Sequence, residues 1–123
     1  MTAFLDESTF TKAITAERAI LFLHAEWSGP SVYGLETFER WEAELPTLTD
    51  LPRVPTFKVQ THEKRFVQEW LDSQKMGFLT ERGNGEILWL ESGKIVELLP
   101  CYVYGKSTDK ITEATQRLWG RKA

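Results

Sequence analysis

Two serines with a histidine close by are the residues whose types and spacing could do chemistry. The segment Ser28-Gly29-Pro30-Ser31 follows an apolar run at 20–23, and His24 lies four residues before Ser28. A histidine can take the proton of an attacking serine hydroxyl, but a third residue must orient the imidazole, and we can place none in the sequence. We therefore expect Ser28 and Ser31 to cap the start of a helix and His24 to be a packed, neutral side chain. Catalysis by Ser28 with His24 is the less favoured alternative.

Cys101 is the only cysteine, so an internal disulfide and a multi-cysteine metal site are both excluded. We expect it to be a half-buried apolar side chain, because only Lys106 lies nearby in sequence to lower the pKa of its thiol. A one-cysteine redox site at Cys101 is the alternative. His62 lies in a predicted turn, and no acidic residues have metal-ligand spacing with the two histidines. The sequence therefore predicts no metal and no cofactor.

The elements that would position these residues follow from hydrophobic periodicity. The apolar run at 19–24 is too short for a helix and predicts a buried parallel strand. Strands are expected at 20–24, 56–60, 86–90 and 94–99, with a short edge strand at 2–5. Helices are expected after Ser8 as N-cap, at 31–45, at 63–74, and from Ser107 or Thr108 to Trp119. Residues 46–55 and 76–85 read as irregular connections, and Glu91-Ser92-Gly93 reads as a hairpin turn.

The resulting order, β-α-β-α-β-α-β-β-α, predicts an α/β fold. Strands that alternate with helices pair in parallel through right-handed crossovers, and the final hairpin adds antiparallel strands. With 123 residues, the chain has the length of one domain. We therefore expect one domain with a central mixed sheet of four to five strands, flanked by helices.

The segment Ala25-Glu26-Trp27-Ser28-Gly29-Pro30-Ser31 resembles the active-site segment of the thioredoxin-like family, in which the two serine positions carry cysteines. The element order resembles that of the family over nearly the whole chain, so the resemblance implies the thioredoxin fold. A cysteine at a helix N-terminus has a lowered pKa and attacks disulfides, whereas a serine hydroxyl is far less acidic and forms no disulfide. The resemblance thus implies a redox-inactive member without disulfide oxidoreductase activity.

Two further positions of the family can be tested in this sequence. The buried carboxylate of the family falls on Phe22, and its cis-proline opposite the motif falls on Gly85. Pro55, in Val54-Pro55-Thr56, is the alternative for the proline position. We favour Gly85, with a trans peptide before it, because a cis bond to a non-proline residue costs roughly 2.5–4 kcal/mol. Both cysteines, the buried carboxylate and the cis-proline of the family are thus absent together, which indicates release from the redox role.

The resemblance also implies a binding surface. In the family the tryptophan beside the motif is commonly exposed on the surface that grips partner polypeptides, and tryptophan is favoured at recognition hot spots. We expect a contact surface formed by Trp27, Ser28, Gly29, Pro30, Ser31, Arg82 and Gly85. Trp70 and Trp119 lie on helical core stripes, and Trp89 could point either way. The segments 46–55 and 76–85 are longer than the family usually needs, and such loops often carry specificity.

Composition narrows the partner class. The net charge of −3 comes without a basic stripe, which argues against nucleic acid, and no apolar run approaches the ~20 residues of a membrane span. The acidic first residues are unlike a signal peptide, so we expect a cytoplasmic protein. The predicted function is a non-catalytic protein-binding module (scaffold, adaptor or chaperone-like) that binds another protein or a second copy of itself. A neutralising partner such as an immunity protein or antitoxin is the alternative binding function.

Overall fold

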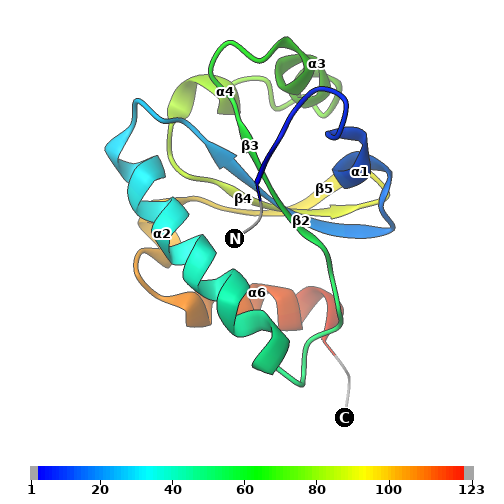
Figure 1. Cartoon of the computed structure of the whole chain (residues 1–123), viewed down its shortest axis with the longest axis vertical. Helices are drawn as coiled ribbons and strands as arrows, with labels where there is room; N and C mark the ends of the chain where they lie inside the picture. Colours follow the sequence, from blue (N-terminus) through cyan, green and yellow to red (C-terminus); the bar gives the residue numbers. More distant parts are fainter. Residues whose placement is uncertain (1–2, 121–123) are drawn as a thin grey trace.

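The computed structural model describes residues 3–120, the side chain of Glu81 excepted, and its five strands form one mixed sheet (Figure 1). The strands are β1 (Phe4–Leu5), β2 (Arg18–His24), β3 (Thr56–Gln60), β4 (Ile87–Glu91) and β5 (Lys94–Leu99). Their order across the sheet is β1-β3-β2-β4-β5. The first three pair in parallel, whereas β4 runs antiparallel to β2 and β5 antiparallel to β4. The predicted α/β fold, with its mixed sheet and closing hairpin, is confirmed.

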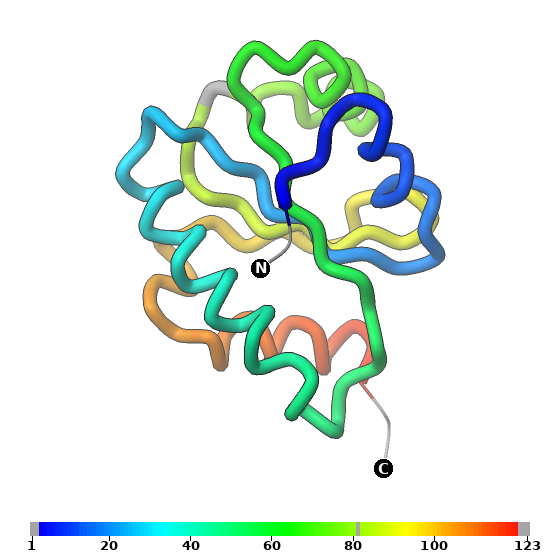
Figure 2. Tube along the Cα trace, in the orientation of Figure 1, coloured from blue at the N-terminus to red at the C-terminus, as the bar shows by residue number. Residues whose placement is uncertain are grey.

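Helices cover both faces of this sheet. They are α1 (Thr11–Thr15), α2 (Gly29–Glu44), the 3-10 turn η1 (Leu45–Thr47), α3 (Arg65–Ser73), α4 (Leu79–Arg82), α5 (Cys101–Tyr104) and α6 (Thr108–Trp119). In Figures 1 and 2, α2 and α6 lie on one side of the strands, and α1 and α3 lie on the other. The short helix α4 falls within a segment predicted to be irregular, and α5 was not predicted at all.

Period-two alternation along the strands sends side chains into two separate cores. Phe22 of β2 packs with Phe38 and Trp41 of α2 in one core, whereas its neighbours Leu21 and Leu23 pack in the other. Six of the seven residues of β2 are buried, so this strand is the centre of the fold. Because both faces of β2 are packed, the two cores fix the end of the strand at His24, where the connection to α2 begins.

The indole N–H groups of the buried tryptophans near α6 each donate a hydrogen bond, as those of buried tryptophans usually do. Trp89 Nε1 donates to Thr115 Oγ1 at 3.0 Å, and Trp119 Nε1 donates to Glu91 Oε1 at 2.6 Å. Trp70 and Trp119 are core residues as predicted, and Trp89 faces α6.

The predicted helix cap at Ser8 is wrong. Ser8 Oγ donates to Asp6 Oδ1 at 2.8 Å, and α1 begins only at Thr11. The Asp6 carboxylate also accepts from Thr9 Oγ1 and from the Thr9 N–H, and these hydrogen bonds lower the pKa of Asp6 to about 2. The aspartate therefore organises the turn that was attributed to the serine. Likewise Ser107, at the N-cap of α6, makes no capping hydrogen bond with its side chain.

Gly34 lies inside α2 because the helix approaches α5 too closely for any side chain. A Cβ atom at this position would overlap the hydroxyl of Tyr104 and would lie 3.4 Å from Cβ of Cys101. Glycine inside a helix costs about 1 kcal/mol relative to alanine, so close packing is the reason to keep it.

Gly34→Ala is therefore expected to destabilise the protein, by roughly 1–3 kcal/mol, because overpacking of the α2–α5 contact outweighs the gain in helix propensity. Urea unfolding of the variant measures this change. Gly29→Ala is the matched control, because a Cβ at Gly29 would meet nothing within 4 Å. A Gly34→Ala variant more stable than wild type would contradict the packing argument.

Within residues 3–120, no helix is both long enough and apolar enough to cross a membrane.

Candidate functional site

The serine segment lies where β2 ends and α2 begins. Ser28 occupies the N-cap of α2 with extended backbone angles, and Pro30 stands in the first turn, where its missing N–H costs no helical hydrogen bond. The helix starts at Gly29, two residues before the predicted start. The segment 83–86, which enters β4, lies opposite this turn.

Neither serine caps the helix with its side chain, which corrects our expectation. Ser28 Oγ instead donates to the carbonyl oxygen of Gly83 at 2.5 Å. Ser31 is fully buried, and its Oγ accepts from the Ala25 N–H at 2.8 Å. Each hydroxyl is engaged by a partner outside α2, so the first-turn N–H groups receive no side-chain oxygen from either serine.

His24 is packed beside the motif, as expected, but next to the other serine. Its Nδ1 lies 3.0 Å from Ser31 Oγ, and its ring stacks on Phe4 with the centroids 5.4 Å apart. Burial lowers the pKa of His24, which favours the neutral imidazole. The structure therefore does not pair His24 with Ser28, the pair that the catalytic alternative requires.

The segment 83–85 is fastened by three hydrogen bonds to consecutive carbonyl groups. Gly83 O accepts from Ser28 Oγ, Asn84 O accepts from the Cys101 N–H at 2.8 Å, and Gly85 O accepts from Tyr104 Oη at 2.6 Å. Gly83 and Gly85 have φ values of +61° and +62°, a left-handed conformation that glycine adopts without strain. This segment is consequently a fixed neighbour of the motif.

Gly85, rather than Pro55, faces the motif. A Cβ on Gly85 would lie 3.1 Å from the carbonyl oxygen of Pro30 and 3.2 Å from Cα of Ser31. Pro55 lies just before β3, where its carbonyl oxygen accepts from the Ile20 N–H at 3.0 Å, near the beginning of β2 rather than its end. No peptide bond between the described residues is cis. The favoured register and the trans peptide before Gly85 are both confirmed.

Trp27 is the exposed tryptophan of the chain. Its side chain is 54% exposed, whereas the other four tryptophans are at most 8% exposed. Its Cη2 atom would lie 2.8 Å from a Cβ on Gly83, so the indole rests on the fixed segment 83–85. The expected exposure of Trp27 is confirmed, and Gly29, Pro30 and Arg82 of the predicted surface are also exposed. Ser28, Ser31 and Gly85 are buried, so these three lie beneath the predicted surface rather than on it.

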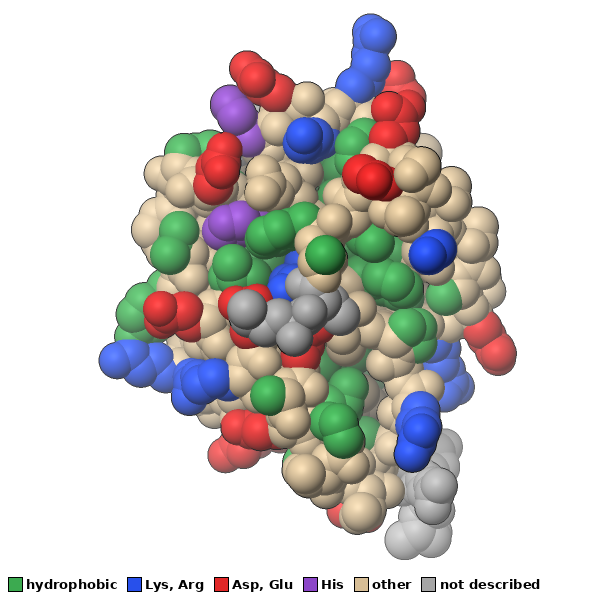
Figure 3. All heavy atoms as spheres, in the orientation of Figure 1, with side chains coloured by type: hydrophobic (Ala, Val, Ile, Leu, Met, Phe, Trp, Pro, Cys, Tyr) green, Lys and Arg blue, Asp and Glu red, His purple; other side chains and the backbone are tan. Residues whose placement is uncertain are grey.

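Most of the exposed apolar side chains belong to the motif and to the segments near it. Of eight large apolar side chains that are exposed among residues 3–120, six belong to the motif and to the segments that flank it: Trp27, Val32, Tyr33, Phe78, Tyr102 and Val103. In Figure 3 hydrophobic side chains lie along the left edge, the side on which α2 starts in Figure 1, and Lys and Arg side chains lie just below them. Arg82 lies 4.6 Å from the Phe78 ring centroid, and Lys106 lies 5.4 Å from that of Tyr33. The sequence reasoning missed Tyr102 and Val103, although an aromatic-rich segment directly after the last strand was a usable signal.

Phe22, which the resemblance places at the family's acid position, is fully buried. Its neighbour across the sheet is Lys58, which is only 2% exposed and went unnoticed in the sequence. The Lys58 ammonium lies 2.8 Å from Glu39 Oε2 and 3.8 Å from Glu42 Oε1, both on α2. The period-two pattern of β3, which points Lys58 inward, was the signal for this buried ion pair.

Glu86 is a second buried charge that sequence reasoning missed. Its side chain is 2% exposed, and Oε1 has no hydrogen-bond partner among the described residues. Burial raises the pKa of Glu86 above its ordinary value of 4.5, while the N–H groups of Glu86 and Asn84 and the charge of Arg82 act in the opposite direction. A buried titratable group therefore follows segment 83–85 directly in the chain.

Glu86→Gln is expected to stabilise the protein relative to wild type at pH 7 and to have little effect near pH 4. A raised native pKa contributes stability below pH 4.5, and this contribution is lost as the pH rises through the native pKa. Urea unfolding of both proteins at several pH values measures the difference, and each comparison with wild type cancels the contribution of His24. A stability difference that shrinks between pH 4 and pH 7 would contradict the assignment.

Cys101 is buried, and burial raises the pKa of its thiol, an effect that a hydrogen bond with Tyr104 opposes. The thiol is therefore protonated at neutral pH and shielded from large disulfides. Among the side chains that the structure describes, no group of three or more from His, Cys, Asp or Glu could hold a metal ion.

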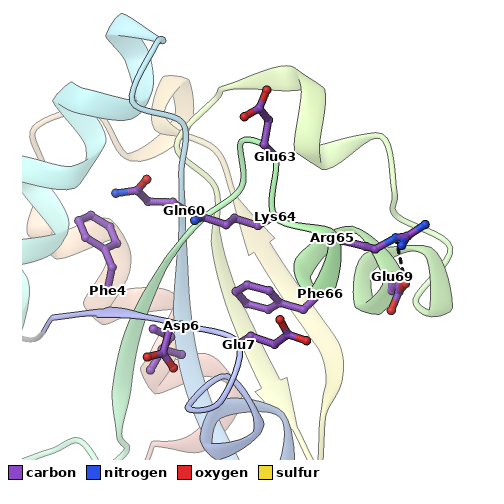
Figure 4. A pocket seen from close by; sticks show the side chains of 10 residues that line it. Phe4, Asp6, Glu7, Gln60, Glu63, Lys64, Arg65, Phe66 and Glu69 are labelled. Atoms are coloured by element: carbon purple, nitrogen blue, oxygen red, sulfur yellow. Dashed lines mark ion pairs between the residues drawn. The ribbon is translucent and has the colours of Figure 1, made fainter.

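A separate hollow of about 580 Å³ lies between β1 and the start of α3, where Phe4, Gln60, Lys64 and Phe66 surround it (Figure 4). Charges of both signs line it, and two of them pair with each other, Arg65 Nε with Glu69 Oε1 at 3.6 Å. Its lining holds four acidic side chains (Asp6, Glu7, Glu63 and Glu69) against two basic ones (Lys64 and Arg65), so its electrostatics disfavour an anionic ligand.

Comparison with known proteins identifies the fold. No protein-family model and no curated protein sequence matches the chain. The germline-specific thioredoxin Deadhead from Drosophila melanogaster superposes with a TM-score of 0.63 at 16% identity, covering 96% of this chain and 99% of that one. Thioredoxin f2 from Chlamydomonas reinhardtii gives 0.61 at 14% identity and covers 96% of both chains. A mutant thioredoxin from Halobacterium salinarum gives 0.61 at 15% identity, covering 98% of this chain and 90% of that one. The chain has the thioredoxin fold.

Proposed function

We propose that this chain is a redox-inactive thioredoxin-fold domain that binds another protein through the exposed surface of Trp27, Gly29, Pro30 and Arg82, which the buried residues Ser28, Ser31 and Gly85 support from below. The observation that carries the proposal is the exposed Trp27 indole, held against the fixed segment 83–85, with further exposed apolar side chains at Val32 and Tyr33 in the first turns of α2. Monomeric proteins rarely leave a contiguous apolar patch in water unless a partner covers it.

The hydrogen bonds at the motif support recognition rather than catalysis. Ser28 uses its hydroxyl to hold Gly83, and Ser31 uses its hydroxyl to hold Ala25, so both serines fix the shape of the surface. A surface fixed before binding loses little conformational entropy when the partner arrives. A single buried thiol also suits a reducing compartment such as the cytosol, where the sequence favours placing the protein.

Site-specific photo-crosslinking in the source cells tests this proposal. A crosslinking amino acid at position 82, which is exposed on α4 within the proposed surface, is expected to capture a defined protein partner. The same amino acid at position 96, which is exposed on the edge strand β5, is the matched control and is expected to capture none. Equal capture from both positions, or capture from position 96 alone, would contradict the proposed surface.

A further inference from the structure

The segment 46–55, which was expected to be longer than the family usually needs, forms with Leu45 an ordered, packed connection between α2 and β3. Leu51 and Val54 are buried in the core on the α2 side, and Leu45 and Leu48 pack against it. The Leu48 N–H donates to Leu45 O at 3.0 Å, and the Leu51 N–H donates to Leu48 O at 3.3 Å. In Figure 2 this segment lies at the opposite end of α2 from Ser28, so it is separate from the surface of the proposed function.

This connection borders a half-open hollow of about 730 Å³. Leu45, Leu48, Leu51 and Val54 line it together with three prolines. The volume falls within the range of ligand sites, about 300–1,000 Å³, and such sites are mostly apolar with a few polar groups that fix orientation. The hollow therefore suits an apolar ligand body.

Two arginines, Arg18 and Arg53, supply positive charge beside this apolar hollow. A second hollow of about 380 Å³ shares Arg53 and Val54 with the first and is also lined by Arg18. The structure records no ion pair for Arg18 or Arg53 among the side chains it describes within residues 3–120, although the Arg18 guanidinium lies 5.4 Å from the Trp119 ring centroid. The two hollows thus share Arg53, an exposed cationic residue whose charge is available to an anion.

Each of the two hollows is also lined by one acidic residue, Glu42 in the first and Glu17 in the second. The Glu42 carboxylate, in the first hollow, accepts from Thr56 Oγ1 at 2.6 Å and lies 3.8 Å from Lys58 Nζ, so it faces positive and donating groups of the protein. Glu17 lines only the second hollow. An anionic head at Arg53 would leave the apolar body beside the leucines of the first hollow.

We propose that this hollow binds a small amphipathic carboxylate of the medium-chain fatty-acid class, with its acyl chain against Leu45, Leu48 and Leu51 and its carboxylate at Arg53 and Arg18. Burial of the chain supplies non-directional affinity, and the guanidinium groups select the head by charge-assisted hydrogen bonds. An amine head would meet the arginines with like charge, and an alcohol would leave their charge uncompensated.

Titration of the ¹⁵N-labelled full chain with octanoate, 1-octanol and octylammonium tests the proposal, because the three probes share one tail and differ in the head. Octanoate is expected to shift the amide signals of residues 45–55 and 16–18 saturably, and to bind about fivefold or more tighter than 1-octanol. Arg53→Gln is expected to abolish this preference while leaving 1-octanol binding unchanged. Arg65→Gln, at an exposed arginine on α3, is the matched control and is expected to change nothing.

Three results would overturn the proposal: shifts that do not saturate with octanoate, saturable shifts centred on other residues, or octylammonium that binds as tightly as octanoate. A loss of octanoate preference in Arg65→Gln equal to that in Arg53→Gln would do the same. None of these outcomes bears on the Trp27 surface, because the two sites share no residue.

Discussion

The wild-type protein is expected to reduce insulin disulfides no faster than the dithiothreitol control. Disulfide exchange requires an attacking thiolate, and positions 28 and 31 offer only hydroxyl groups, both engaged in hydrogen bonds. The remaining thiol, Cys101, is buried with a raised pKa. Insulin precipitation above the control rate, abolished by Cys101→Ser, would refute this expectation.

A Ser28→Cys/Ser31→Cys variant sharpens the test. The two cysteines are expected to form a disulfide, because they would stand three residues apart at the start of α2, yet the variant is expected to remain a poor reductase. Phe22 supplies no carboxylate behind the second thiol, and Gly85 stands where the family places proline. The substitutions also remove the hydroxyls that hold Gly83 and Ala25. Full thioredoxin-like activity would show that Phe22 and Gly85 do not limit the chemistry.

The fold was predictable because its longer elements carry regular patterns. The strands at 56–60 and 94–99 match β3 and β5 in both bounds, and the second helix was misplaced by only two residues at its start. Short elements escaped detection, since a four-residue helix such as α4 or α5 is too short to show a hydrophobic period. The two-residue strand β1 lies inside the predicted span 2–5, of which Thr2 lies outside the described residues.

The candidate site was only partly predictable. The motif, the exposed Trp27 and the position of Gly85 followed from the resemblance. The roles of the serine hydroxyls did not, because Ser28 finds its partner 55 residues away and local capping is the ordinary expectation for a serine there. Lys58 and Glu86 were missed for a related reason. Charged residues are rarely buried, so a sequence does not suggest that they are, unless the alternation of side chains along a strand is followed strictly.

The Trp27→Ala variant tests the central claim most directly. Because Trp27 is 54% exposed, the substitution is expected to leave the melting temperature nearly unchanged. Its binding to the crosslinked partner, or its self-association if the partner is a second copy, is expected to weaken by about 2 kcal/mol or more, roughly thirtyfold in Kd. Val96→Ala is the matched control, since Val96 is an exposed apolar residue on β5.

One melting curve and one binding isotherm for each protein provide the measurement. The account predicts that Trp27→Ala has the melting temperature of wild type and a lower affinity for the partner, whereas Val96→Ala keeps the wild-type affinity. A buried, structural tryptophan would behave in the opposite way and cost about 3–5 kcal/mol of stability when truncated. A large loss of stability in Trp27→Ala with unchanged association would contradict the claim that this surface binds a protein.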